Sequence, residues 1–165
     1  MTETQLAPVI ARRSLSNTYR YAGGIVSILI DGEDTGGTFS AWEASQKPGG
    51  EPPLHLHHTM DETFYIVEGN IRFMVGDRII DGGPGDMVFA PRGIPHTFRI
   101  KSEVAKAVTV CTPAGFEEWF RELGEPVQSL ELPGEIKPLS EADFAKTPAL
   151  AMRLRLDLIQ RDVNF

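Results

Sequence analysis

The chain has 165 residues, of which 41% are hydrophobic, and it carries a formal net charge of −7. This length allows one domain with an ordinary core, and the negative charge opposes nonspecific binding to nucleic acid or to an anionic membrane surface. The chain starts without a basic and apolar leader and has no segment long enough to span a membrane, so we expect a cytoplasmic protein.

The first part of the chain, residues 1–20, shows weak periodicity and is expected to form an N-terminal arm that can pack on a partner subunit. From residue 21 to residue 112, short runs rich in apolar, β-branched and aromatic residues alternate with Gly, Pro, Asn and Asp, which is an all-β pattern. The runs that predict strands are 25–30, 38–44, 63–67, 71–75, 87–90, 97–101 and 105–111.

All four histidines lie in two short blocks punctuated by glycine, and the first block holds three of them. Side chains on a strand repeat every two residues, so His55 and His57 project from one face and His58 from the other. Glu62 lies an odd number of residues beyond His57. A bend through residues 58–61 is therefore required if Glu62 is to join the two histidines.

The second block returns the chain to the same place. A tight turn at Gly69-Asn70 follows the strand after Glu62, and Pro91, Gly93 and Pro95 lead into His96. Ligands so far apart in the sequence require a closed or rolled sheet. We therefore expect residues 21–112 to form a β-barrel.

After residue 112 the pattern becomes helical. Pro113 suits the first turn of a helix, Gly124 suits its end, and Phe116 and Phe120 share one face, which either seals the barrel or serves as a lid over a substrate. A second helical stretch has Ser140 as N-cap and is expected to be interrupted at Pro148. Residues 113–165 are thus expected to pack on the barrel as a helical extension within a single domain.

Three imidazoles and one carboxylate without a thiolate suit a first-row divalent ion, so one ion of Fe, Ni, Mn, Cu, Co or Zn is expected, and the sequence does not choose among them. Four protein ligands on a six-coordinate ion leave two positions for a substrate or for dioxygen. The alternative is a closed site that only stabilises the barrel. Glu62 is either a ligand alone or a ligand that also takes a proton as general base.

The two blocks resemble the signature motifs of the cupin superfamily, which are small double-stranded β-helix (jelly-roll) barrels. In that family the matching residues bind one metal ion inside the barrel, and here they are His55, His57, Glu62 and His96. One departure is Ile100, where the second motif usually ends in Asn. Because that position is not a ligand, the resemblance still implies a metal site, and it also implies a homodimer paired through strands and terminal arms.

A narrower resemblance joins segments 34–37, 52–55, 61–65 and 112–117 to single-domain bacterial cupins labelled quercetin 2,3-dioxygenase-like. Proteins similar in these segments include oxygenases acting on flavonols and also proteins of no known substrate. The resemblance therefore indicates the fold and the metal site more sharply than the reaction.

Period-two counting places several apolar side chains on the inner faces of the strands that carry the ligands. They can pack as core or line a substrate pocket, and a pocket would also include the two phenylalanines of the first helix. The candidate pocket residues are Phe64, Ile66, Ile71, Phe73, Val75, Phe98, Phe116 and Phe120.

Four other side chains bear on the site. His58 and Tyr65 are expected to point away from the ligands, toward the surface or a subunit contact, whereas the face of Trp42 is ambiguous. Cys111 lies in an apolar strand and is expected to be buried, with a catalytic thiol as the alternative. It is the only cysteine, so no internal disulfide can form.

The first functional hypothesis is a metal-dependent dioxygenase of the quercetinase-like type, in which a flavonol-like enol binds the ion and Glu62 takes its proton. The second is a non-redox cyclase or isomerase of polyketide-like or sugar-like enols. The third is a small-molecule binding protein or sensor without turnover. Oxygen uptake separates the first from the second, and turnover of any kind separates both from the third.

Overall fold

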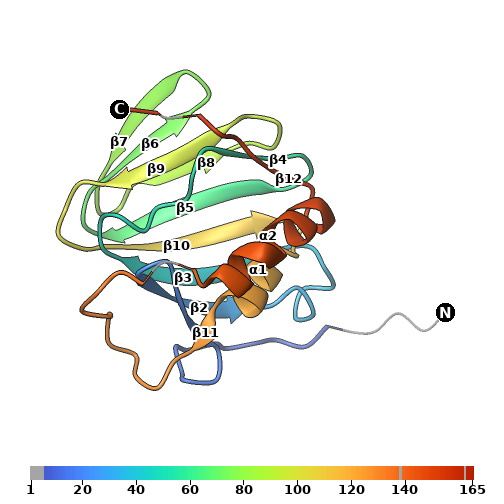
Figure 1. Cartoon of the computed structure of the whole chain (residues 1–165). Coiled ribbons are helices and arrows are strands. Elements are labelled where there is room, and N and C mark those ends of the chain that lie inside the picture. The colour runs from blue at the N-terminus through green and yellow to red at the C-terminus, as the bar shows by residue number, and fades with distance from the viewer. Residues whose placement is uncertain (1–5, 138, 162) are drawn as a thin grey trace.

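The computed structural model of this protein describes residues 6–137, 139–161 and 163–165 and has two antiparallel sheets face to face (Figure 1). The larger sheet has the order β11-β1-β2-β3-β10-β5-β8, and its strands are Glu125–Pro126, Thr18–Tyr21, Gly24–Ile30, Ser40–Gln46, Ala105–Thr112, Asp61–Glu68 and Met87–Ala90. The smaller sheet has the order β12-β4-β9-β6-β7, with strands Leu156–Leu158, His55–His57, His96–Ile100, Ile71–Val75 and Arg78–Gly82. The predicted all-β jelly-roll fold is confirmed.

The strand predictions for residues 71–75 and 87–90 match β6 and β8 to the residue, and the turn at Gly69 joins β5 to β6 with a φ of +80°, where glycine is favoured. No strand had been predicted at β1, β7, β11 or β12, whereas β4 had been expected from the histidine spacing alone. Each of these four strands is five residues long or shorter. Such strands need little apolar sequence, because partners supply their hydrogen bonds.

The chain crosses between the sheets where the ligand spacing requires a bend. β4 lies in the smaller sheet and β5 in the larger one, so residues 58–60 carry the chain from one sheet to the other. β9 pairs with β4 in the smaller sheet and aligns His96 with His55. The expected bend after His57 is therefore confirmed as a crossover between sheets.

Two groups of buried side chains fill the interior. The helix-side cluster consists of Val26, Trp42, Met60, Cys111, Phe116, Trp119, Phe120, Leu123, Leu150, Ala151, Leu154 and Leu156. The sheet-side cluster consists of Phe64, Ile66, Ile71, Phe73, Val75, Val88, Ala90, Ile100, Ala105 and Ala107.

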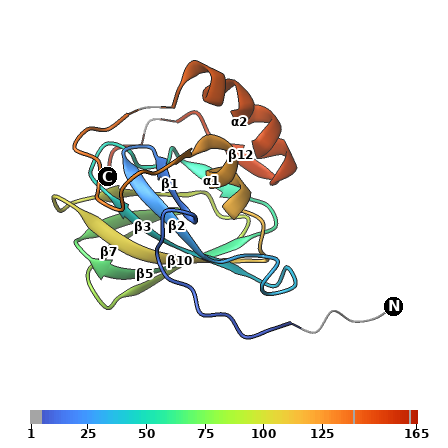
Figure 2. The same ribbon diagram turned by 90° about the horizontal axis from the view of Figure 1, so that it is seen from below.

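The two helices are α1 (Glu117–Leu123) and α2 (Glu141–Arg153), which lie against one another beside the barrel (Figure 2). α1 begins four residues later than expected, because Gly115 has a φ of +133°, outside the helical range, and Phe116 is the N-cap. It ends at Gly124 as predicted.

The Ser140 cap on α2 is confirmed, because its side chain accepts a hydrogen bond from the Asp143 amide. The expected interruption at Pro148 is wrong, since α2 continues through it to Arg153. Proline removes one backbone donor, and the burial of Thr147, Leu150 and Ala151 on either side of it offsets that loss.

The segment after residue 112 is more than a helical extension. β11 pairs with β1 in the larger sheet, and β12 pairs with β4 in the smaller one. β1 likewise begins at Thr18, inside the expected arm, whose residues 1–5 lie outside the described part of the chain. Both ends of the chain therefore contribute strands to the barrel sheets. Among the described residues, no helix combines the length and apolar character needed to cross a bilayer.

Candidate metal centre

The structure brings the four predicted ligands together inside the barrel. His55 and His57 come from β4, Glu62 from β5 and His96 from β9, and one ligand atom of each lies within 4.8 Å of the others. The Nε2 atoms of His96, His57 and His55 lie 2.8, 3.5 and 3.8 Å from Glu62 Oε2. All four residues are buried, so the donor atoms face one another and not bulk solvent.

Backbone carbonyls orient two of the three imidazole rings. His55 Nδ1 lies 2.9 Å from the Pro53 carbonyl oxygen, and His96 Nδ1 lies 3.0 Å from the Ile94 carbonyl oxygen. A carbonyl only accepts, so each Nδ1 carries a hydrogen and leaves Nε2 to face the centre, where loss of its own proton would free a lone pair for a metal. Partners of this kind orient histidines that ligate metals.

The third ring, that of His57, shows that these residues fit a metal ion. His57 is fully buried, and neither of its ring nitrogens has a hydrogen-bond partner within the described chain. Buried polar nitrogens are normally satisfied, because an unpaired one loses its hydration without compensation. A divalent ion bound by His57 Nε2, together with two further imidazoles and one carboxylate, would satisfy that nitrogen.

Electrostatics keep the Glu62 carboxyl group ionised. Burial alone would raise its pKa, but the three imidazoles around it, with His96 hydrogen-bonded at 2.8 Å and His55 and His57 close by, hold the pKa well below its usual range. Burial also opposes charge on His96, yet the Glu62 carboxylate beside it raises the pKa of that imidazole. For His55 burial dominates and lowers the pKa. The cluster therefore presents one ionised carboxylate surrounded by three imidazole rings.

The loop between β8 and β9 is fastened on both sides of the cluster. Arg92 binds Asp61 through its backbone N and its Nε at 2.8 and 3.0 Å to Oδ1, and through a terminal nitrogen at 2.6 Å to Oδ2. The Gly93 amide donates to the His57 carbonyl at 2.8 Å. These contacts hold the loop that leads into His96 against the strands that carry Glu62 and His57.

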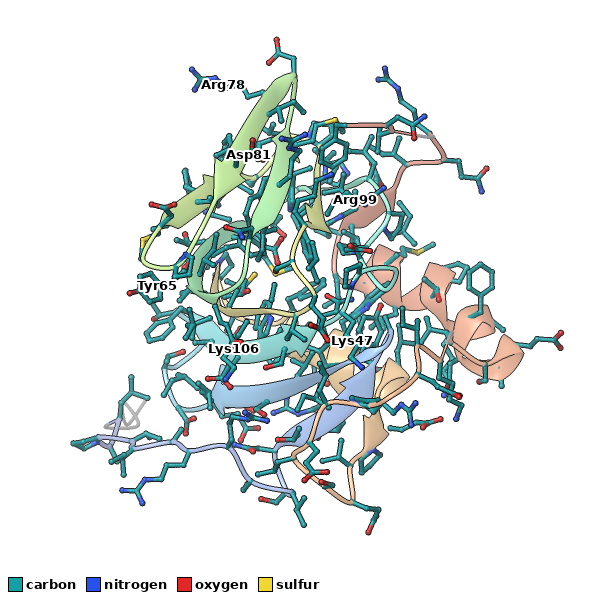
Figure 3. The ribbon with its side chains drawn as sticks, turned by 90° about the vertical axis from the view of Figure 1, so that its left-hand side faces the viewer. Lys47, Tyr65, Arg78, Asp81, Arg99 and Lys106 are labelled. Atoms are coloured by element: carbon teal, nitrogen blue, oxygen red, sulfur yellow. The ribbon has the colours of Figure 1, made fainter. Side chains whose placement is uncertain are left out.

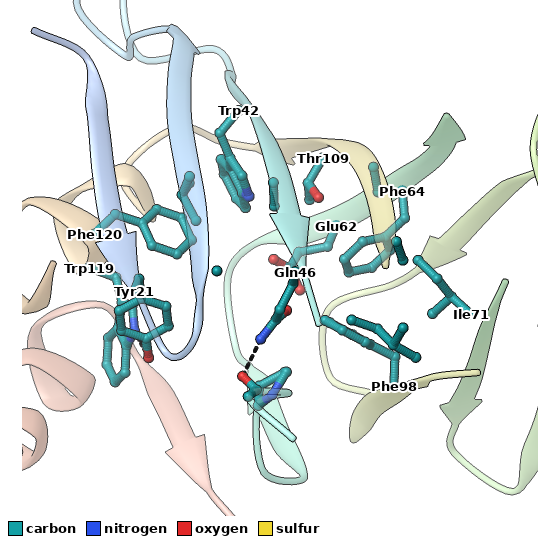
Figure 4. A pocket seen from close by; sticks show the side chains of 18 of the residues that line it. Tyr21, Trp42, Gln46, Glu62, Phe64, Ile71, Phe98, Thr109, Trp119 and Phe120 are labelled. Carbon is teal, nitrogen blue, oxygen red and sulfur yellow. Dashed lines mark hydrogen bonds between the residues drawn. The ribbon is translucent and has the colours of Figure 1, made fainter. Parts of the chain in front are cut away.

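A cavity of about 140 Å³ opens beside the cluster (Figure 4). His55 and Glu62 form part of its wall, so a bound molecule can reach the ligand atoms. The predicted pocket residues that line it are Phe64, Ile71, Phe73, Phe98, Phe116 and Phe120.

Two predicted pocket residues, Ile66 and Val75, do not line the cavity and instead pack within the sheet-side cluster. Ile66 is fully buried, and its side chain lies over Gly82 at the end of β7. Val75 lies at the end of β6 that pairs with His96, away from Ile71. Period-two counting gave the correct face for both residues but could not give their distance from the cavity.

Sequence reasoning missed Tyr21, Thr109 and Trp119 in the cavity wall and left Trp42 undecided. Trp42 points inward and is 3% exposed, and β10 places Thr109 opposite both Trp42 and Phe64. Thr109 could have been found by the alternation along the predicted strand 105–111. Trp119 lies three residues after Phe116 at helical spacing, whereas nothing had predicted a strand at Tyr21.

The cavity wall is mostly apolar and carries no lysine or arginine among the described residues. Within the described part of the chain, Glu62 is the only acidic side chain in this wall. A ligand that is itself an anion would therefore find no protein cation there, and only a metal ion could balance its charge.

The remaining expectations concern side chains away from the cluster. His58 is exposed, and its Nε2 lies 2.9 Å from Asp157 Oδ2. Tyr65 points to the surface and is 43% exposed (Figure 3). Cys111 is fully buried, and burial raises the pKa of its thiol. These positions match a surface role for the first two and a core role for the cysteine.

Comparison with known proteins gives one family and one curated relative. The family model described as "Cupin domain" matches residues 42–112. Quercetin 2,3-dioxygenase of Bacillus subtilis (strain 168) is 32% identical over 112 residues, which cover 68% of this chain and 33% of that protein. The chain thus matches about a third of the length of this relative.

Solved structures share the barrel. KdgF from Halomonas sp. has a TM-score of 0.59 at 15% identity and covers 68% of this chain and 99% of its own. Pac13, a nucleoside dehydratase of Streptomyces, has a TM-score of 0.52 at 14% identity over 65% of this chain and 85% of its own. Oxalate decarboxylase of Bacillus subtilis, with Mn(II) centres, has a TM-score of 0.55 at 25% identity and covers 68% of this chain and 32% of its own. The first two likenesses show the fold alone.

Proposed function

This chain belongs to the cupin superfamily, and from that premise we propose that it is a metal-dependent dioxygenase acting on a flat enol of the flavonol type. What supports this reaction class is the surroundings of the cluster: three histidines and Glu62 adjoin an aromatic cavity without a cationic side chain. A sugar would leave most of its hydroxyl groups unpaired against that wall. A flat aromatic enol would bury its rings and direct its oxygens at the cluster.

The residues of the chain have separate roles in this proposal. His55, His57, His96 and the Glu62 carboxylate would hold a divalent ion, which would supply Lewis acidity. Glu62, already ionised, accepts the proton of the substrate hydroxyl on its carboxylate oxygen. The aromatic wall orients the rings and excludes water from the cluster.

We also propose that the protein is a homodimer. Large apolar side chains lie exposed on neighbouring strands of the larger sheet: Tyr65 and Val67 on β5 are each 43% exposed, and Met87 and Phe89 on the edge strand β8 are 66% and 55% exposed. Contiguous apolar patches of this kind mark association surfaces. Sedimentation should show a dimer, and Phe89→Glu should shift it toward the monomer; a monomeric parent would contradict the proposal.

Oxygen consumption tests the reaction class. Protein loaded with iron, nickel, manganese or cobalt should shift the absorbance of 3-hydroxyflavone as the enolate forms, and should consume oxygen with at least one metal. Glu62→Gln should retain ligand binding and lose turnover, because the amide cannot take the proton.

The outcomes separate the candidate functions. Binding without oxygen uptake in every metal form would replace the dioxygenase with the non-redox cyclase or isomerase. If no metal form binds the ligand, the flavonol-type substrate is wrong and a sensor or another substrate class takes its place.

A further inference from the structure

One polar side chain of the cavity wall, that of Thr109, lies next to the layer of Glu62. In the larger sheet Glu62 on β5 pairs with Cys111 on β10, and the next inward pair along these two strands is Phe64 with Thr109. Successive inward positions on a strand are two residues apart, which is about 7 Å. Thr109 therefore lies one step from the metal centre, and Figure 4 shows its side chain between those of Trp42 and Phe64.

The fold makes no use of the Thr109 hydroxyl. The residue is 3% exposed and its side chain faces the cavity, yet no residue of the described chain forms a hydrogen bond with its hydroxyl. Its partners across the strands are Trp42 and Phe64, which offer rings and no polar group on this side. Valine has the same shape and would fill the position without an unpaired hydroxyl among apolar groups. The hydroxyl is therefore available to a ligand.

Two other groups of the wall are free to bind a ligand, but they lie further from Glu62. Tyr21 accepts a hydrogen bond through its phenol oxygen, and no residue of the described chain accepts its proton. Gln46 donates its amide nitrogen to two backbone carbonyls and keeps its side-chain carbonyl free. Both residues pair with Gly24 of β2, and Gln46 also pairs with the first residue of β10. They can bind the remote end of a ligand, whereas Thr109 can bind atoms beside the oxygens directed at Glu62.

We propose that Thr109 determines ligand specificity: its hydroxyl donates a hydrogen bond to a ligand oxygen that flanks the two oxygens directed at the metal centre. This inference rests on the proposed flavonol-type substrate and narrows it to compounds with a third oxygen beside the chelating pair. In a flavonol the chelating pair is the 3-hydroxyl and the 4-carbonyl. The flanking positions are then position 5 of the fused ring and position 2′ of the pendant ring.

Four isomeric dihydroxyflavones test this inference through their dissociation constants. All four carry the 3-hydroxyl; two have the second hydroxyl at a flanking position, 5 or 2′, and two have it at a remote position, 7 or 4′. The isomers have the same composition, so only the place of one oxygen differs. Quenching of the fluorescence of Trp42 and Trp119, measured with nickel-loaded protein under nitrogen, reports binding without oxygen-dependent turnover.

Thr109→Val should weaken the binding of one flanking isomer about fivefold relative to both remote isomers, as expected for the loss of one hydrogen bond. Only one flanking isomer should respond, because a ligand held at Glu62 turns one of its two rings toward Phe64. The melting temperature of the ligand-free variant should equal or exceed that of the parent, because valine removes an unpaired hydroxyl from the wall.

Thr18→Val is the matched control. Thr18 on β1 is 1% exposed and lies outside the cavity wall, and its hydroxyl forms a hydrogen bond with the Ser27 hydroxyl at 2.7 Å. The same substitution at this position should lower the melting temperature by about 2–4 °C. It should leave the relative affinities of the four isomers unchanged.

Equal weakening of all four isomers by Thr109→Val, or no weakening of any, would overturn the role of Thr109 and leave the proposed function in place. A melting temperature that falls as it does in Thr18→Val would show that the hydroxyl serves the fold, and would overturn that role as well. Absence of binding by all four isomers to the unaltered protein, with and without metal, would overturn the proposed substrate class and this inference with it.

Discussion

The sheet-side and helix-side clusters fill the same barrel but draw on different parts of the chain. The sheet-side cluster runs from Phe64 to Ala107 and comes from strands and the turns between them. The helix-side cluster collects residues from Val26 to Leu156 and includes both helices and β12. One half of the barrel is thus closed by consecutive strands. The other half, which contains Tyr21, Trp42 and Trp119, is closed by the C-terminal segment. Stability and ligand selection can therefore change separately in the two halves.

The largest expected effect breaks the sheet-side cluster. Ile66→Ala removes a fully buried side chain that does not line the cavity, so it should cost about 2–5 kcal/mol of unfolding free energy in urea. The folded variant should keep its metal and ligand affinities. Leu150→Ala is the helix-side counterpart and should also weaken 3-hydroxyflavone, because α2 contacts β12. Equal ligand affinities in both variants would show that the two halves are not separable in this way.

The next effect concerns the cluster between the two halves. His96→Ala should lose metal, and with it the stabilisation that binding gives the folded form, about 2.7 kcal/mol when free metal is at a hundred times its dissociation constant. Metal content of the purified protein and its melting temperature with and without chelator measure the two losses. His58→Ala, one residue beyond a ligand but exposed, should retain both. Equal metal content in His96→Ala and the parent would contradict the ligand assignment.

Metal affinity should depend on pH through the same cluster. The pKa of His96 is raised by Glu62, so a proton occupies this imidazole up to a pH above 6.5 and must leave before a metal can bind. Affinity should therefore rise with pH through the raised pKa, by up to tenfold or about 1.4 kcal/mol per pH unit, and then level off. Calorimetry in buffers of different ionisation enthalpy should detect the released proton. Affinity that is flat between pH 6 and 8 would refute this.

In the metal-free protein the two pKa shifts act in opposite pH ranges. The raised pKa of His96 stabilises the folded state fully below about pH 6.5, the unfolded pKa. This stability is lost as the pH rises through the pKa of the folded state. The lowered pKa of Glu62 stabilises the folded state above about pH 4.5, the unfolded pKa. This stability is lost as the pH falls through the pKa of the folded state.

The smallest effect belongs to the helix that covers the helix-side cluster. Ser140→Ala removes the side chain that accepts from the Asp143 amide, and loss of such a cap should cost about 1 kcal/mol. Chemical denaturation measures it, and Ser140→Asp, which can cap in the same way, should restore the stability. A neutral alanine variant would mean that the first turn of α2 contributes little to the fold.

Local patterns predicted most of the barrel and the convergence of the ligands. The period of two placed His55 and His57 on one face, and the odd spacing to Glu62 required the chain to turn there. Neither pattern depends on distant contacts. The same counting gave the correct face for Ile66 and Val75 but not their distance from the cavity, because depth within a barrel depends on which strands close over a residue.

The features that were missed depend on distant parts of the chain. Tyr21 lies in the cavity wall because β1 pairs with β2 and β11. No local apolar run predicts such a short strand. Pro148 predicted a helix end from local chemistry, yet packing of Leu150 and Ala151 continues the helix. Residues 156–158 form a strand only because β4 offers them an edge. The cavity wall was therefore harder to predict than the ligands.

The pairing of β12 with β4 determines when this site can be completed during synthesis. His58 and Asp157 face each other across these strands but are 99 residues apart. At 5–20 residues per second, about 5–20 seconds pass on the ribosome between the two. During that interval the outer edge of β4, with both of its histidines, has no strand beside it, and an open edge can pair with other chains. This edge of β4 therefore stays open until residues 156–158 have been made and can pair with it.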